Sequence, residues 1–410
     1  MAFPSSIMLV LCAAVTASGR PNANRPLTEA AVVELALQRE PLREVIDGLA
    51  EAEQGRALAT RARPLPQVTY LREQTYGTSG TGEDYLSVAQ TIRLGGRPRV
   101  RVAAGDARVR AARHEGDAMR IGVVADARER FYDALHRDLR VEAVRAWIGR
   151  IDAMLAIVER REGRGDAAVY DRRRLERERQ VASSRLELEL AASDRAQARL
   201  AAITGTSGGE VELAGALLPE LEPDALPVLK AKGTSRPDLL ALDLQGVAAR
   251  HDLEALSRTW LPDLRLEAGW KGVGMPGVGR ADGFMLAAML SFQPRHLAAG
   301  ARKIALGDAR SLHGQRALVT SEITGELTGA RAEAVRLRRV ALEFRAGAVE
   351  TSADLVRIAS VGYEGGELGL LEVLDAYRGQ ADDALTAIDL EHAAQRARIH
   401  VDRVAGVDQP

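Results

Sequence analysis

The hydrophobic positions of this chain follow two different periods, and each period predicts one kind of element. Over most of the length apolar residues recur every three or four positions, which is typical of helices. Helical patterns continue without interruption over 97–160 and 300–350, longer than the helices of ordinary globular domains. A glycine-marked turn and a further helical pattern of about forty residues follow each of them. The chain is therefore expected to be built mainly from long helical hairpins.

In two places the period changes to two, which predicts β-hairpins. The expected strands cover about 67–76 and 85–94, then about 263–272 and 283–293. Each is about ten residues long, the length that a tilted strand needs to cross a bilayer. Two amphipathic hairpins packed on a soluble core would show the same alternation. Aromatic residues gather in or beside these hairpins, as at a membrane interface: Tyr70, Tyr76, Tyr85, Trp260, Trp270, Phe284 and Phe292.

The whole pattern occurs twice. The turn at Gly165 and Asp166 and the helical stretch after it return 201 positions later, at Gly366 and Glu367, where the turn begins with Gly365. A repeat of this length predicts a duplicated architectural unit rather than a solenoid. The fold class is therefore α+β, with a duplicated unit of helix, strand, strand, long helix and helix. The first repeat is expected over 27–205 and the second over 234–406, with a connector at 206–233.

Composition and charge narrow the function. Charged residues make up 28% of the chain and aromatic residues only 4%, which favours long helices with narrow contact surfaces. The net charge of −1 gives no attraction to nucleic acid. Cys12 is the only cysteine, so a disulfide framework and a cysteine metal site are excluded. His392 and His400 lie on one helical pattern and are interpreted as packing or surface residues rather than metal ligands. No catalytic constellation and no cofactor motif is found, so an enzyme is not expected.

The N-terminus resembles an export signal. An apolar run over 7–17 is too short to span a bilayer, and small residues suited to cleavage follow it. No Lys or Arg precedes the run. A signal peptide is predicted at 1–23.

Four strands cannot close a barrel, because small closed barrels have about eight. Unpaired strand edges cannot lie in hydrocarbon. If the hairpins enter a membrane, several chains must share one barrel, and physical reasoning alone permits two, three or more.

Three segments resemble a known family, and together with the repeat they extend the resemblance over nearly all of 27–406. Leu27-Thr28-Glu29-Ala30 is similar to its opening helix, the junction Ser87-Val88-Ala89-Gln90-Thr91-Ile92-Arg93-Leu94-Gly95-Gly96-Arg97 to its strand-to-helix transition, and Tyr363-Glu364-Gly365-Gly366-Glu367-Leu368 to its second inter-helix turn. The family is that of the TolC-type outer-membrane efflux factors, and the junction is most similar to the heavy-metal CzcC-like branch.

This resemblance implies a homotrimer with a twelve-stranded barrel in the lipid of the outer membrane and a long helical barrel through the periplasm. It also implies two partners, a periplasmic adaptor (membrane fusion protein) and an inner-membrane pump of the RND type. The function implied is a passive exit duct for heavy-metal cations or small toxic compounds, driven by the pump.

The resemblance also implies a gate. Glu372 and Asp375 occupy the carboxylate positions that ring the periplasmic mouth, and Gly165, Asp166, Gly365, Gly366 and Glu367 form the turns at the periplasmic tip. At a spacing of three residues both carboxylates point along one helix face, so a trimer would gather six around the pore axis and favour divalent cations. A solvated helix face is the other interpretation of these two residues. Leu368 stands where some members have a basic residue.

A soluble periplasmic coiled-coil adaptor or scaffold is the alternative function. The feature that separates the two is the pair of alternating hairpins, because an adaptor would interrupt one helical hairpin with compact β-domains.

Overall fold

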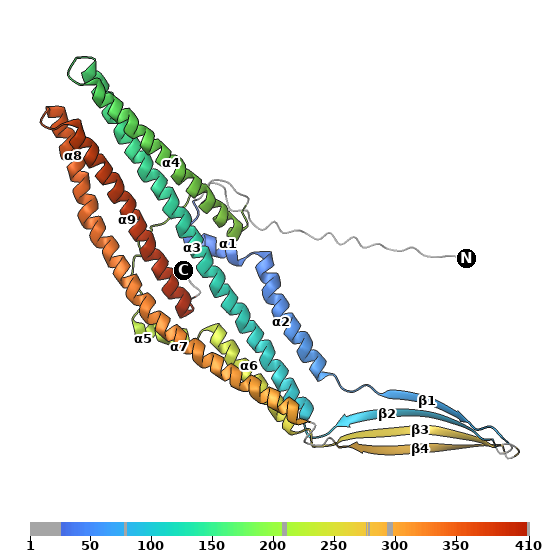
Figure 1. The fold of residues 1–410 in the computed structure, drawn as a ribbon. Coiled ribbons are helices and arrows are strands. Elements are labelled where there is room, and N and C mark those ends of the chain that lie inside the picture. Colours follow the sequence, from blue (N-terminus) through green and yellow to red (C-terminus); the bar gives the residue numbers. More distant parts are fainter. Residues whose placement is uncertain are drawn as a thin grey trace, which may run out of the picture.

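Long helices and a small sheet make up the computed structural model, which describes residues 26–77, 80–206, 211–275, 277, 279–292 and 298–407 (Figure 1). The sheet lies at one end, and the helices extend from it to two inter-helix turns at the other end. We call the end with these turns the tip. The predicted signal peptide at 1–23 lies outside the described residues.

The first half of the chain begins with two helices, α1 (Glu29–Leu37) and α2 (Glu40–Arg61). Strands β1 (Gln67–Gln74) and β2 (Gly82–Arg93) follow. Helix α3 (Arg97–Glu162) then runs to the tip, and α4 (Val169–Thr204) returns beside it. Gly95 and Gly96, with φ of 81° and 68°, turn the chain between β2 and α3.

The second half repeats this order with α5 (Leu226–Thr234), α6 (Pro237–Ser257), β3 (Asp263–Met275) and β4 (Gly279–Ser291). Its long helix consists of α7 (Ala299–Phe344), a π-helical turn η2 (Arg345–Val349) and α8 (Glu350–Gly365). Helix α9 (Leu370–Ala405) returns from the tip. The uninterrupted helix expected over 300–350 is therefore wrong in one detail, because the pattern of apolar positions does not register a single π-helical turn.

The two halves correspond closely. Helices α4 and α9 both have 36 residues, with starts at 169 and 370, an offset of 201. Helices α1 and α5 both have nine residues. Since α5 is the counterpart of α1, the structural correspondence places the start of the second repeat at Leu226, inside the segment 206–233 that was interpreted as connector.

The four strands form one antiparallel sheet in the order β1-β2-β3-β4, which leaves β1 and β4 at its edges. Strand limits differ from the expected ones mainly at the end away from the helices. There β3 and β4 stay paired through Val273↔Ala281 to Met275↔Gly279. The sequence indicated a loop at this place because glycines interrupt the alternation of side chains, although their backbone pairs normally.

One face of the sheet is apolar across all four strands. Partners in register place Val68, Val88, Ala268 and Leu286 in one row of this face. The next row away from the helices contains Tyr70, Leu86, Trp270 and Phe284, and the row after that contains Arg72, Asp84, Gly272 and Asp282. The face thus changes from aliphatic to aromatic to charged along the strands.

Polar contacts occupy the opposite face. Lys271 Nζ lies 2.9 Å from Glu83 Oε2, and Ser87 Oγ donates to Glu267 Oε1 at 2.6 Å. Arg265 Nη1 donates to Gln67 Oε1 at 2.6 Å, from β3 to β1. Side chains of alternate residues therefore face two different environments, as period two requires.

The core follows the lines where helices touch, in separate clusters along the molecule. One cluster near α1 includes Phe131 and Ile399, and another toward the tip includes Ile151 and Leu374. A third joins α5, α6, α7 and α9, and a fourth contains alanines of α3 and α6. This arrangement agrees with the narrow contact surfaces expected from composition. Within the described residues, no helix has an apolar stretch long enough to cross a membrane.

Candidate functional site at the helical tip

The two inter-helix turns at the tip have the same backbone geometry. In the first turn Gly165 has φ of 85°, and the amide of Asp166 donates to the carbonyl of Arg161 at 2.9 Å. In the second turn Gly366 has φ of 79°, and the amide of Glu367 donates to the carbonyl of Gly362 at 2.8 Å. Both are Schellman caps, which need a residue with positive φ after the helix end and so favour glycine.

Arg161 links the two turns. Its Nη1 donates to the carbonyl oxygen of Tyr363 at 2.9 Å, and its guanidinium lies over the Tyr363 ring, 5.0 Å from the centroid. The hydrogen bond and the cation–π contact join the end of α3 to the end of α8. Burial raises the pKa of Tyr363 above its ordinary value, so the ring stays neutral beside the cation.

Glu372 and Asp375 lie in the first turns of α9, where both are exposed. The neighbouring Val373, Leu374 and Tyr377 are buried, so the helix turns its apolar face inward and both carboxylates outward. Among the described residues neither carboxylate makes an ion pair or a hydrogen bond. The structure thus places the two predicted residues together on one free face next to the tip.

Leu368 takes a packing role. It lies against Gly362, where an added Cβ would come within 2.8 Å of Leu368 Cδ1, and it packs on the apolar cluster near the tip. The cation that holds the two tip turns together is instead Arg161, on the other hairpin. Sequence reasoning missed this residue because one arginine among the many on α3 gives no signal of its own.

Two ion pairs connect α4 with α9 below the tip. Arg378 binds Glu178 through both guanidinium edges, with Nε 2.6 Å from Oε1, and Arg185 Nη1 lies 3.2 Å from Asp382 Oδ1. The hydrogen bonds from Glu178 raise the pKa of Arg378. Glu178 is only 5% exposed, so its carboxylate depends on this partner. Sequence reasoning missed this pair as well, although a glutamate at an apolar seam position was a usable signal.

We expect Arg378→Ala to destabilise the α4–α9 contact by roughly 1–3 kcal/mol, because it leaves the Glu178 carboxylate buried without its partner. The figure is at the lower end because the Arg378 side chain is 44% exposed. Denaturant unfolding would measure the change. Arg357→Ala is the matched control, since Arg357 and its partner Asp354 are both 71% exposed, and its effect should stay within about 0.5 kcal/mol. Equal effects of the two variants would contradict a role for the pair.

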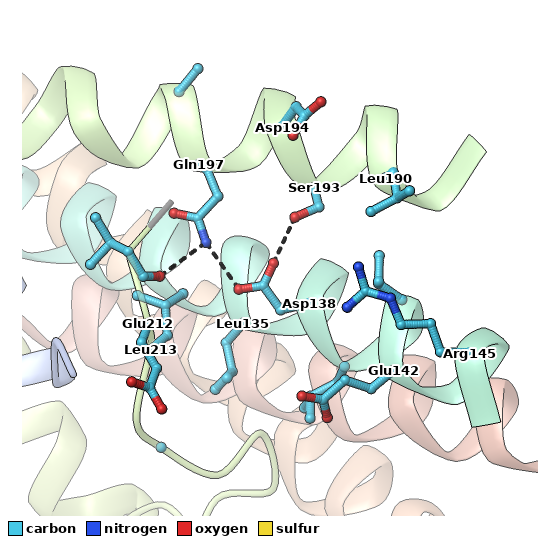
Figure 2. A pocket seen from close by; sticks show the side chains of 15 residues that line it. Leu135, Asp138, Glu142, Arg145, Leu190, Ser193, Asp194, Gln197, Glu212 and Leu213 are labelled. Carbon is cyan, nitrogen blue, oxygen red and sulfur yellow. Dashed lines mark hydrogen bonds between the residues drawn. The ribbon is translucent and has the colours of Figure 1, made fainter. Parts of the chain in front are cut away.

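A second candidate region is a cleft of about 930 Å³ between α3, α4 and the chain at 211–215 (Figure 2). Asp138 accepts hydrogen bonds from Ser193 at 2.6 Å and from Gln197 at 2.9 Å. Gln197 also donates to the carbonyl of Val211 at 3.4 Å, so these side chains hold the connector against the hairpin. The lining residues include no histidine, cysteine or lysine. The cleft therefore has an attachment role in the fold.

No metal centre is formed by the part of the chain that the structure describes, since no three His, Cys, Asp or Glu residues there are placed to share an ion. His400 Nε2 lies 2.7 Å from Glu326 Oε1, and His392 Nε2 lies 2.9 Å from Asp133 Oδ1. Both histidines thus have carboxylate partners on other helices.

Comparison with known proteins identifies the fold. No protein-family model matches the chain, and no curated protein matches it. Three solved structures match over nearly the full length. The open state of the Neisseria gonorrhoeae MtrE outer membrane channel has a TM-score of 0.74 at 14% identity and covers 92% of this chain and 88% of that one. The outer membrane protein VceC from Vibrio cholerae has a TM-score of 0.71 at 16% identity, covering 92% and 96%. The Campylobacter jejuni CmeC outer membrane channel has a TM-score of 0.69 at 13% identity, covering 99% and 93%.

The chain therefore has the TolC-like channel fold, a helix-rich architecture with an antiparallel sheet, as the sequence predicted.

Proposed function

We propose that this chain is the outer-membrane channel subunit of a tripartite efflux system and acts as a homotrimer. The observation that carries this proposal is the four-stranded sheet with an apolar face and two unpaired edges. An open sheet cannot lie in hydrocarbon, because the edge amides and carbonyls would have no partners. If β4 of one copy pairs with β1 of the next, three copies close a twelve-stranded barrel.

The side-chain rows of the sheet support insertion in a membrane. The aliphatic rows would face lipid, and the row with Tyr70, Trp270 and Phe284 would lie at the interface. The charged row beyond it would lie in water. On the other face, the ion pair of Lys271 with Glu83 and the hydrogen bond of Ser87 with Glu267 suit a water-filled interior.

The helices would then continue the barrel through the periplasm, with the tip directed toward a periplasmic adaptor and an inner-membrane pump of the RND type. The free carboxylates Glu372 and Asp375 would ring the mouth in a trimer and attract cations. The cargo proposed is heavy-metal cations or small toxic compounds. The CzcC-like junction at 87–97 favours the metal cations.

Cell fractionation and light scattering test this proposal together. The mature protein should be found in the outer membrane, should need detergent for extraction, and should then have the mass of three chains. A soluble periplasmic monomer would instead support the adaptor or scaffold function.

A further inference from the structure

The contact between α3 and α9 contains a reciprocal pair of Asp-x-x-His motifs. On α3 these are Asp133 and His136, and on α9 they are Asp389 and His392, with the same spacing of three residues. His136 Nε2 lies 2.7 Å from Asp389 Oδ1, and His392 Nε2 lies 2.9 Å from Asp133 Oδ1. Each histidine therefore bonds to the carboxylate of the opposite helix.

The two imidazole rings also stack on each other. Their centroids are 4.2 Å apart and their planes differ by 12°. Since both carboxylates are acceptors, each Nε2 carries the proton that it donates. Neutral rings can stack in this way, but a proton gained by one ring would lie buried against its neighbour.

Burial separates His136 from its carboxylate partner. The His136 side chain is 7% exposed, whereas Asp389 is 51% exposed. Burial lowers the pKa of His136 to about 4, and the hydrogen bond from His136 to Asp389 only partly offsets this effect. Burial would raise the pKa of Asp389, but the hydrogen bonds from His136 and Arg140 outweigh it and hold that pKa below the usual range. His136 therefore titrates within mildly acidic conditions in which Asp389 stays ionised.

Other charged groups around the pair come from every helix that packs on it. Arg140 binds Asp389 at 2.6 Å and also Glu189 of α4. Arg345 of η2 binds Glu391, which is adjacent to His392, at 2.9 Å. Further contributions to the local field come from Arg137 and Arg396.

The pair lies between two apolar clusters of the same contact. Leu135 belongs to the cluster near α1, and Val144 belongs to the cluster toward the tip. At the offset of 201 that relates α4 to α9, Asp389 and His392 correspond to Leu188 and Ala191. The Asp-x-x-His motif of α9 is therefore absent from its repeat counterpart, so the repeat does not account for it.

We propose that the reciprocal pairs His136–Asp389 and His392–Asp133 form a proton-sensitive latch between α3 and α9, which loosens in mild acid. When the helices separate locally, His136 becomes hydrated and regains its ordinary affinity for a proton. The open form then binds one more proton than the closed form between about pH 6.5 and 4, so stability of the contact falls as the pH falls. The open population should rise by up to about tenfold per pH unit in this range. The latch does not rest on the proposed channel function.

Hydrogen exchange of the full-length protein in detergent tests the latch. Protection factors, corrected for the intrinsic rate at each pH, would be measured for peptides covering 131–140 and 386–396 between pH 4 and 7.5. We expect protection in the wild-type protein to fall by roughly 10- to 100-fold in acid. His136→Asn keeps an N–H donor for Asp389 but has no titrating ring, so its protection should be nearly independent of pH.

His400→Asn is the matched control, because His400 is on the same helix and also bonds to a carboxylate but is 44% exposed. This control should keep the wild-type pH dependence. Selective labelling of histidine gives a second measurement, an NMR titration of His136 in the wild-type protein. Protection that does not change with pH, an unchanged slope in His136→Asn, or titration of His136 at its ordinary value would each overturn the proposal.

Discussion

Leu286→Arg is expected to abolish assembly of the channel, whereas Met285→Arg should be tolerated. The two residues are neighbours on β4 with side chains on opposite faces of the sheet. Leu286 is opposite Ala268 in the middle of the apolar face, and Met285 is opposite Gly269 on the polar face. An arginine at the middle of the lipid face of a barrel costs about 2–4 kcal/mol. A trimer would bear this cost three times.

The amount of trimer in isolated outer membranes, and its unfolding by urea in lipid vesicles, would measure the effect. Met285→Arg adds the same charge at the next position and so controls for arginine in the strand. Equal loss of trimer in both variants would mean that the face with Leu286 does not meet lipid.

Glu372→Gln combined with Asp375→Asn should weaken cation selectivity and the block of the channel by divalent ions applied from the periplasmic side. In a trimer the double variant removes six charges from the mouth while nearly preserving shape. One carboxylate about 4 Å from a divalent ion contributes about 2 kcal/mol even in water, so losing several should weaken the block by more than tenfold. Stability should change little, because both side chains are exposed.

Planar-bilayer recordings would give both quantities. Glu350→Gln combined with Asp354→Asn is the control, since it neutralises two exposed carboxylates of α8 farther from the tip turns. If the block is unchanged in the tip variant, Glu372 and Asp375 belong to a solvated outer face and not to the mouth.

Local patterns in the sequence were sufficient for the architecture. The change of period from 3.6 to 2 located all four strands, and the repeat of the turns at Gly165 and Gly366 matches two caps with the same hydrogen bonds. These features depend on the geometry of a single element or turn, which neighbouring residues determine. The strand ends were less accurate, because Gly272 and Gly274 pair in the sheet without contributing to the alternation.

The contacts that connect the hairpins came only from the tertiary structure. The bond from Arg161 to Tyr363, the pair of Arg378 with Glu178, and the stack of His136 on His392 join residues about 200 or more positions apart. Such contacts depend on how each helix is rotated and how far it is shifted along its neighbour. Helical periodicity defines the apolar face of a helix but leaves this shift open, so many polar pairings remain compatible with one sequence.

The sequence by itself therefore determined the elements, their order, the duplication and the two-faced character of the strands, because each follows from local periodicity. The tertiary structure decided which edges of the sheet remain unpaired, which cation joins the tip turns, and that His392 meets His136 through opposed Asp-x-x-His motifs. The physical reason is that these properties arise from packing between helices, where small axial shifts exchange one polar partner for another.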